Sequence, residues 1–127
     1  MAEGKFGTAV NCMDGRVQEQ VVAWMKENFG VDHVDMITDP GPDGILACGK
    51  TEGIENIRKR VLISVNAHGS KCLAIVGHHD CAGNPCSKEE HLKHIKASLE
   101  TIGSWDLPLE LVGLWINEEW KVEKLDL

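Results

Sequence analysis

The sequence lacks tyrosine, has only two phenylalanines, and contains no apolar run near the roughly 18 residues that a membrane-spanning helix needs. Its start, MAEGKFGTAV, has neither the basic flank nor the long apolar stretch of a secretion signal. Basic residues are also few, because 13 Lys and Arg stand against 20 Asp and Glu for a net charge of −7. Nucleic-acid phosphates and anionic membrane surfaces repel such a chain, so we expect neither as a partner.

No internal repeat and no linker rich in Pro, Gly or Ser divides the 127 residues, so we expect a single domain over residues 1–127. Five cysteines without an export signal favour a reducing cytoplasm and metal or thiolate chemistry over a disulfide framework. A Cys-x-x-Cys pair for thiol exchange is missing. Gln18 and Ser87 stand where a phosphate-binding Cys-x5-Arg loop needs arginine, which disfavours a thiol phosphatase.

Short apolar runs alternate with segments of helical periodicity along the chain. In the first such segment, apolar residues recur every four positions from Val17 to Phe29. This alternation predicts an α/β fold with a mainly parallel sheet of four to five strands, in the order 2-1-3-4, flanked by helices on both sides. We predict an extended tail over residues 120–125, helices over 17–29, 52–68 and 88–102, and strands over 6–12, 34–38, 71–77 and 109–116.

Candidate metal ligands follow the first and third predicted strands, whose carboxyl ends meet at a crevice in this strand order. Cys12 ends the first strand, and His78 and Cys81 follow the third. Two thiolates and an imidazole form a zinc ligand set that leaves a fourth position for water or substrate. A single buried cysteine is more often core packing, so the joint occurrence of the three residues carries this prediction.

Asp14 has two alternative roles at this crevice. As a fourth zinc ligand it closes the site. Paired instead with Arg16, two residues later, it stays ionised and orients a zinc-bound hydroxide. Such a hydroxide is available as a nucleophile near neutral pH, because zinc lowers the pKa of a bound water to about 7. The sequence leaves both roles open.

The two segments together resemble the motif pair of the β-class carbonic anhydrases. The first is Cys-x-Asp-x-Arg over residues 12–16, and the second is Gly-His-x-x-Cys over residues 77–81. The resemblance covers most of the chain. The chain departs from the family in having no helices and no glutamine before its first strand, and Asp39-Pro40-Gly41-Pro42 in place of an Arg-Asn-Ala type turn.

The resemblance implies a fold like that of the β-class carbonic anhydrases. It implies that Zn²⁺ is bound by Cys12, His78 and Cys81, and that the dyad of Asp14 and Arg16 controls access to the fourth position. The implied enzyme is a zinc lyase for the reversible hydration of CO2 to bicarbonate, with zinc-bound hydroxide as the nucleophile. The implied assembly is a homodimer or a higher homo-oligomer.

Three alternatives stay open. The first is a non-catalytic zinc-binding module, and the second is a hydrolase of carbonyl sulfide or carbon disulfide on the same fold. The third is nucleotide binding, because Gly44–Thr51 matches the phosphate-loop pattern G-x-x-x-x-G-K-[ST]. Pro40 and Pro42 remove amide donors just before this segment, which favours a chance match and a flexible loop beside the crevice.

The remaining residues with chemical potential are assigned supporting or surface roles. We interpret them as follows: Cys48 and Cys72 as structural, Cys86 as a spare thiol near the crevice, His79 as a residue that supports His78 or faces solvent, Asp80 as the cap of a turn, and His91 and His94 as surface residues.

Overall fold

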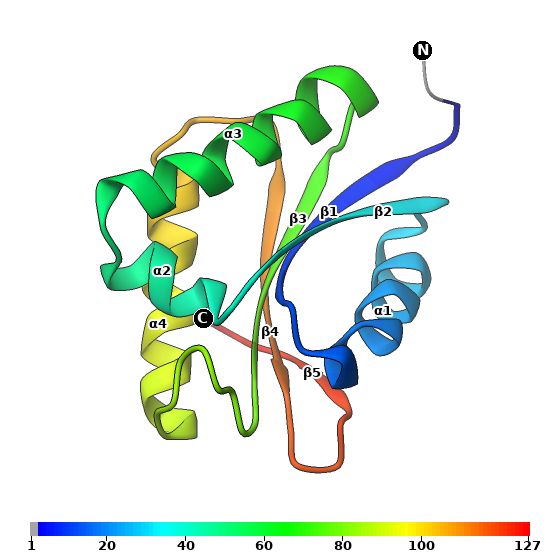
Figure 1. Ribbon diagram of the computed structural model, residues 1–127. Coiled ribbons are helices and arrows are strands. Elements are labelled where there is room, and N and C mark those ends of the chain that lie inside the picture. Colours follow the sequence, from blue (N-terminus) through cyan, green and yellow to red (C-terminus); the bar gives the residue numbers. More distant parts are fainter. Residues whose placement is uncertain (1–2) are drawn as a thin grey trace.

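A computed structural model describes residues 3–127 of the chain (Figure 1). The strands in this part are β1 (Phe6–Cys12), β2 (His33–Asp39), β3 (Cys72–His78), β4 (Glu110–Ile116) and β5 (Val122–Lys124). The helices are the 3-10 turn η1 (Gly15–Val17) and the α-helices α1 (Glu19–Phe29), α2 (Pro42–Cys48), α3 (Thr51–His68) and α4 (Lys88–Gly103). Over residues 3–127, no helix combines the length and the apolar character that crossing a membrane requires.

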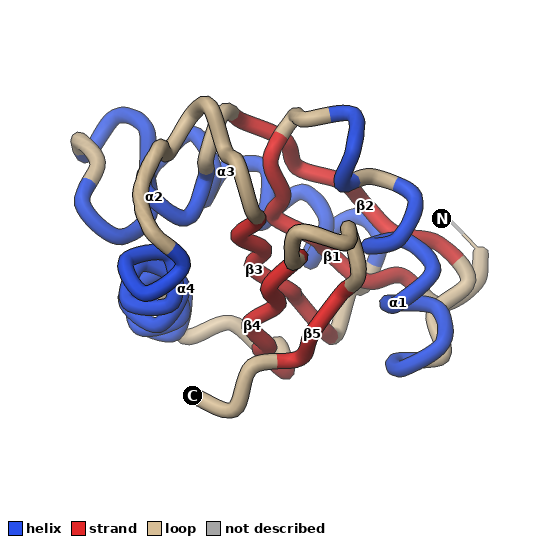
Figure 2. Tube along the Cα trace, turned by 90° about the horizontal axis from the view of Figure 1, so that it is seen from below, coloured by secondary structure: helices blue, strands red, loops and turns tan. Residues whose placement is uncertain are grey.

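The strands form one sheet in the order β2-β1-β3-β4-β5. The pairs β1–β2, β1–β3 and β3–β4 are parallel, and β5 is antiparallel to β4. Figures 1 and 2 show α1 on one face of the sheet and α2, α3 and α4 on the other. The predicted order 2-1-3-4 and the helices on both faces are therefore confirmed, and the predicted extended tail contributes the fifth strand.

The central strand β3 explains why the sheet needs two helical layers. All seven residues of β3 are buried. Because side chains alternate along a strand, Ala74 and Val76 pack in the core beneath α1, whereas Leu73 and Ile75 pack in the core beneath α3 and α4. A strand covered on both faces has the continuous apolar sequence seen here.

The segment between β2 and α3 was expected to be a flexible loop, but it contains α2. Pro42 occupies the first helical position, where a missing N–H leaves no hydrogen bond unmade. The amides of Gly44 and Ile45 donate to the carbonyl of Gly41, and the amide of Gly49 donates to Ile45. Because these N–H groups are hydrogen-bonded to backbone carbonyls of a helix, they are not free to bind a phosphate. The phosphate-loop interpretation of Gly44–Thr51 is therefore wrong.

The expectation that His91 lies on the surface is also wrong. Its side chain is 1% exposed, and its Nδ1 lies 2.6 Å from Oδ2 of Asp43, which is equally buried. His91 belongs to the stripe of α4 that faces α2 and the sheet, together with Ile95 and Ser98. Its neighbour His94 is half-buried, with Nδ1 2.9 Å from the side-chain amide of Asn84.

Candidate metal centre

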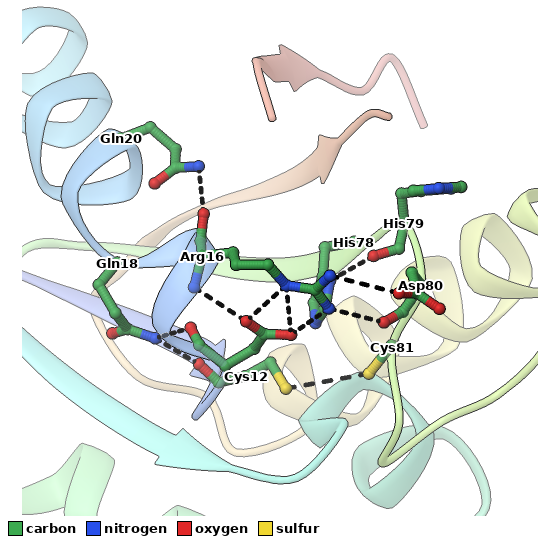
Figure 3. A network of polar contacts seen from close by, with 9 residues as sticks. Cys12, Arg16, Gln18, Gln20, His78, His79, Asp80 and Cys81 are labelled. Carbon is green, nitrogen blue, oxygen red and sulfur yellow. Dashed lines mark hydrogen bonds and ion pairs between the residues drawn. The ribbon is translucent and has the colours of Figure 1, made fainter. Parts of the chain in front are cut away.

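Three ligand-type side chains meet at the carboxyl edge of the sheet. Cys12 is the last residue of β1, His78 is the last residue of β3, and Cys81 lies in the loop that follows. All three are buried, and their ligand atoms lie within 4.8 Å of one another (Figure 3). Parallel neighbouring strands end at the same edge, which is why residues so far apart in the sequence come together.

The two sulfur atoms are spaced for a metal ion. Cys12 Sγ and Cys81 Sγ are 3.8 Å apart, and both cysteines are free thiols. A tetrahedral zinc with Zn–S bonds of about 2.3 Å places two thiolate sulfurs about 3.8 Å apart. A disulfide requires about 2.05 Å. The sulfur pair therefore has the geometry of two ligands of one ion.

His78 presents the nitrogen that a metal requires. Its Nδ1 lies 2.7 Å from the backbone carbonyl oxygen of His79. A carbonyl only accepts, so Nδ1 carries the proton and Nε2 carries a free lone pair. Nε2 is buried and has no hydrogen-bond partner among the described residues. Buried polar atoms nearly always have a hydrogen-bond partner or a bound ion. The free lone pair of His78 Nε2 therefore fits coordination of the same metal ion as the two thiols.

The surroundings of the cysteines favour ionised sulfur. A hydrogen bond from Cys81 lowers the pKa of Cys12 to about 4, against the effect of burial and with help from His78 and the amide of Gly41. Cys81 donates that hydrogen bond and is itself buried, and both effects raise its pKa. The two sulfurs thus share one proton. A metal cation held by Cys12 and Cys81 would take the place of that proton, because thiolate is the form of cysteine that binds metals.

Asp14 is held by Arg16 rather than grouped with the three ligand atoms. Arg16 donates to both oxygens of the Asp14 carboxylate, from Nη2 at 2.7 Å and from Nε at 3.0 Å, and its amide adds a third bond at 2.8 Å. These hydrogen bonds lower the pKa of Asp14 to about 2. The structure thus pairs Asp14 with Arg16, and the role of Asp14 at a bound metal stays a prediction.

Gln18 was missed in the sequence, although it fixes the backbone of this motif. Its side-chain amide donates at 2.7 Å to the carbonyl of Cys12 and at 2.7 Å to the carbonyl of Asp14 (Figure 3). An amide side chain of this kind leaves no pattern that distinguishes it from an ordinary surface glutamine. The side chain of His79 is exposed, and only its carbonyl supports His78.

The remaining thiols lie apart from the ligand group. Cys72 is buried at the start of β3, where its sulfur packs against Gly7. Cys48 and Cys86 are exposed.

The loop that carries Cys81 packs tightly on the turn before α2. A Cβ added at Gly83 would lie 2.6 Å from the amide nitrogen of Gly41 and 2.7 Å from Cβ of Pro40. Gly41 itself has φ +58°, a left-handed conformation that favours glycine. This close approach brings the amide of Gly41 to Cys12 and the amide of Gly83 to Cys81. Backbone donors from both loops therefore stabilise the thiolates.

We expect Gly83→Ala to weaken metal binding about tenfold, since overpacking costs about 1–3 kcal/mol and the added Cβ forces the Cys81 loop away from Gly41. Zinc affinity, measured by competition with a chromophoric chelator, tests this. Gly103→Ala is the matched control, because a Cβ at Gly103 meets nothing within 4 Å. Equal affinity in the two variants would contradict the proposed role of the close approach.

Two comparisons with known proteins found matches, one to a family and one to a solved structure. Residues 2–126 match the sequence model of a family described as "Putative carbonic anhydrase". The fold is similar to that of a tetrameric beta-carbonic anhydrase from the filamentous ascomycete Sordaria macrospora, with a TM-score of 0.59 and 13% sequence identity. That match covers 97% of this chain and 81% of the fungal chain. A search of curated protein sequences found no match.

Proposed function

The chain belongs to the family described as "Putative carbonic anhydrase", and from this premise we propose that it is a zinc enzyme for the reversible hydration of CO2 to bicarbonate. One observation carries the proposal. The buried Nε2 of His78, which has no hydrogen-bond partner within residues 3–127, lies with the thiols of Cys12 and Cys81 in one group, next in sequence to an Asp–Arg pair. This donor set is that of a catalytic zinc site with three protein ligands.

In this proposal, Cys12, His78 and Cys81 hold the zinc ion. A zinc ion with an open fourth position supplies a hydroxide nucleophile near neutral pH, because it lowers the pKa of a bound water to about 7. The backbone carbonyl of His79 fixes the tautomer of His78 and makes Nε2 a better ligand.

In this proposal Asp14 positions a group beside the metal ligands, and Arg16 holds the charged carboxylate of Asp14 in place. Asp14 is ionised and accepts hydrogen bonds only, so it orients an O–H group beside the metal ligands. Arg16 holds both carboxylate oxygens of Asp14 and thereby keeps this side chain from serving as a fourth ligand. The site keeps room for substrate through this pairing.

We further propose a cytoplasmic homo-oligomer that exchanges CO2 and bicarbonate with solution. The tetrameric state of the fungal carbonic anhydrase of similar fold supports an assembly of identical subunits.

Stopped-flow measurement of CO2 hydration by the zinc-loaded protein tests the proposed reaction. Hydration well above the buffer rate supports it. One zinc per chain without hydration contradicts it, and the same preparation then distinguishes a hydrolase of carbonyl sulfide or carbon disulfide from a non-catalytic zinc module.

We expect Asp14→Asn to retain zinc and to lower kcat about 10- to 100-fold, a loss typical of residues that orient metal-bound groups. The neutral amide binds Arg16 less strongly and offers an N–H where the carboxylate only accepts. The control is Asp106→Asn, since Asp106 is exposed in the loop between α4 and β4. Zinc content and stopped-flow kinetics are compared, and an unchanged kcat would remove Asp14 from the mechanism.

A further inference from the structure

Two residues with unusual backbone conformations contact the same side chain. Within residues 3–127, Asp80, Asp106 and Trp120 are the non-glycine residues with positive φ, at 56°, 53° and 63°. Positive φ is uncommon for residues with a Cβ and is an outlier for a bulky one such as tryptophan. Such conformations persist only where the surrounding structure imposes them, and they gather at functional sites. Asp80 and Trp120 both contact Arg16.

Trp120 covers the guanidinium of Arg16. The central carbon of that group lies 4.4 Å from the centroid of the Trp120 ring, which is cation–π geometry. The same ring lies 6.4 Å from the ring of His78, so it borders the metal centre. The side-chain amide of Gln20 joins the two segments, because it lies within hydrogen-bond distance of the carbonyls of Arg16, at 2.7 Å, and Trp120, at 3.0 Å.

The turn between β4 and β5 holds Trp120 in place. The side-chain oxygen of Asn117 accepts from the amides of Glu119 and Lys121, at 2.9 and 3.2 Å, and the amide of Trp120 donates to the carbonyl of Asn117. Asn117 also donates to Glu123 in β5 at 2.7 Å. The conformation of this turn is therefore fixed from within.

Asp80 takes the outer edge of the same guanidinium. Its carboxylate accepts from Nη1 of Arg16 at 3.3 Å, and its backbone carbonyl accepts from Nη2 at 3.1 Å (Figure 3). The opposite edge, formed by Nε and Nη2, faces Asp14. The planar group is thus held on two edges and one face, although the Arg16 side chain is 46% exposed.

We propose that Trp120 and Asp80 are positioning residues that hold Arg16 with its Nε–Nη2 edge toward Asp14. The inference rests on the proposed function and extends it to the β4–β5 turn, which closes one side of the metal centre. An exposed arginine without these contacts has many orientations in solvent, and only a few of them bind both oxygens of Asp14. The strained turns at Asp80 and Trp120 restrict Arg16 to that orientation in advance.

Kinetics of Trp120→Leu and Trp120→Phe test the effect on the reaction. We expect Trp120→Leu to lower kcat about two- to fivefold with KM unchanged, as the size of an exposed cation–π contact implies. Trp120→Phe keeps an aromatic face and is expected to recover most of the loss. Trp105→Leu is the matched control, since Trp105 is also half-buried and precedes Asp106, the remaining non-glycine residue with positive φ within residues 3–127. An equal loss in the Trp105 variant would overturn the inference.

A second measurement does not depend on activity. The chain has only three arginines, so the Nε–H resonance of Arg16 is readily assigned in the zinc-loaded protein. The Nε–H of Arg16 donates to Asp14, so we expect its exchange with solvent to become faster in Trp120→Leu and to be largely restored in Trp120→Phe, while exchange at Arg58 and Arg60 stays unchanged. Unchanged exchange at Arg16 in Trp120→Leu overturns the inference. If the wild-type protein fails to hydrate CO2 but exchange at Arg16 becomes faster in Trp120→Leu, the proposed function fails and the positioning of Arg16 stands.

Discussion

Replacing Cys81 by serine is expected to remove zinc from the protein and to lower CO2 hydration more than about 100-fold, beyond the loss typical of residues that only support a ligand. A serine hydroxyl does not ionise near neutral pH, so only Cys12 and His78 remain as effective ligands. Metal analysis should show a decrease from about one zinc per chain to almost none. Stopped-flow hydration measured on the same samples should fall in parallel.

The chain offers a close control in Cys86→Ser. Cys86 is exposed, lies in the same loop as Cys81, and makes a 3.6 Å hydrogen bond to Asn84 that serine can replace. We expect zinc content and hydration to stay unchanged in this variant. Added zinc should raise the melting temperature of the wild type and of Cys86→Ser but not of Cys81→Ser, because a ligand stabilises only the protein that binds it. Stoichiometric zinc in Cys81→Ser would contradict the assigned ligand set.

The sheet and the meeting of its three ligand-type residues could be predicted from the sequence because both follow from local patterns and handedness. The apolar runs fixed the strands, and right-handed crossovers left few strand orders open. Once β1 and β3 are parallel neighbours, Cys12 and His78 must end at the same edge, and Cys81 follows within one turn. No information about side-chain packing was needed for that step.

The features that were missed depend on contacts between distant segments. His91 resembles a surface histidine when α4 is considered alone, and it is buried only because Asp43 supplies a partner from α2. The segment with Pro40 and Pro42 resembles a turn, yet Pro42 begins a helix. The stacking of Trp120 on Arg16 likewise joins opposite ends of the chain. Local sequence carries no record of such pairings.

These missed contacts converge on the loops that hold the candidate metal ligands. The carboxylate of Asp43 accepts from Asn84 at 3.1 Å as well as contacting His91. Asn84 follows Cys81 in the loop after β3, and the backbone amide of Asn84 is among the donors that stabilise the thiolate of Cys81. Asp43 also lies two residues after Gly41, whose amide faces Cys12. The buried carboxylate of Asp43 thus links the segments whose amides face Cys12 and Cys81 to the buried side of α4.

We therefore expect His91→Leu to lower the free energy of unfolding by about 3 kcal/mol, because it leaves a carboxylate buried without its main partner. Asp43 and His91 are each 1% exposed, so water cannot replace the lost contact without opening the interface between α2 and α4. Urea denaturation at a fixed, saturating zinc concentration measures the change.

A double variant separates this explanation from a simple loss of packing. In Asp43→Leu/His91→Leu no buried carboxylate remains, so we expect the double variant to be more stable than the sum of the two single losses predicts. His94→Leu is the control on the same helix, since it removes a half-buried contact to Asn84 and an edge-on ring contact to His91 but leaves the Asp43–His91 contact in place, and it should cost about 1 kcal/mol. Additive losses in the double variant, or an equal loss in His94→Leu, would show that the Asp43–His91 contact is not what holds α2 against α4.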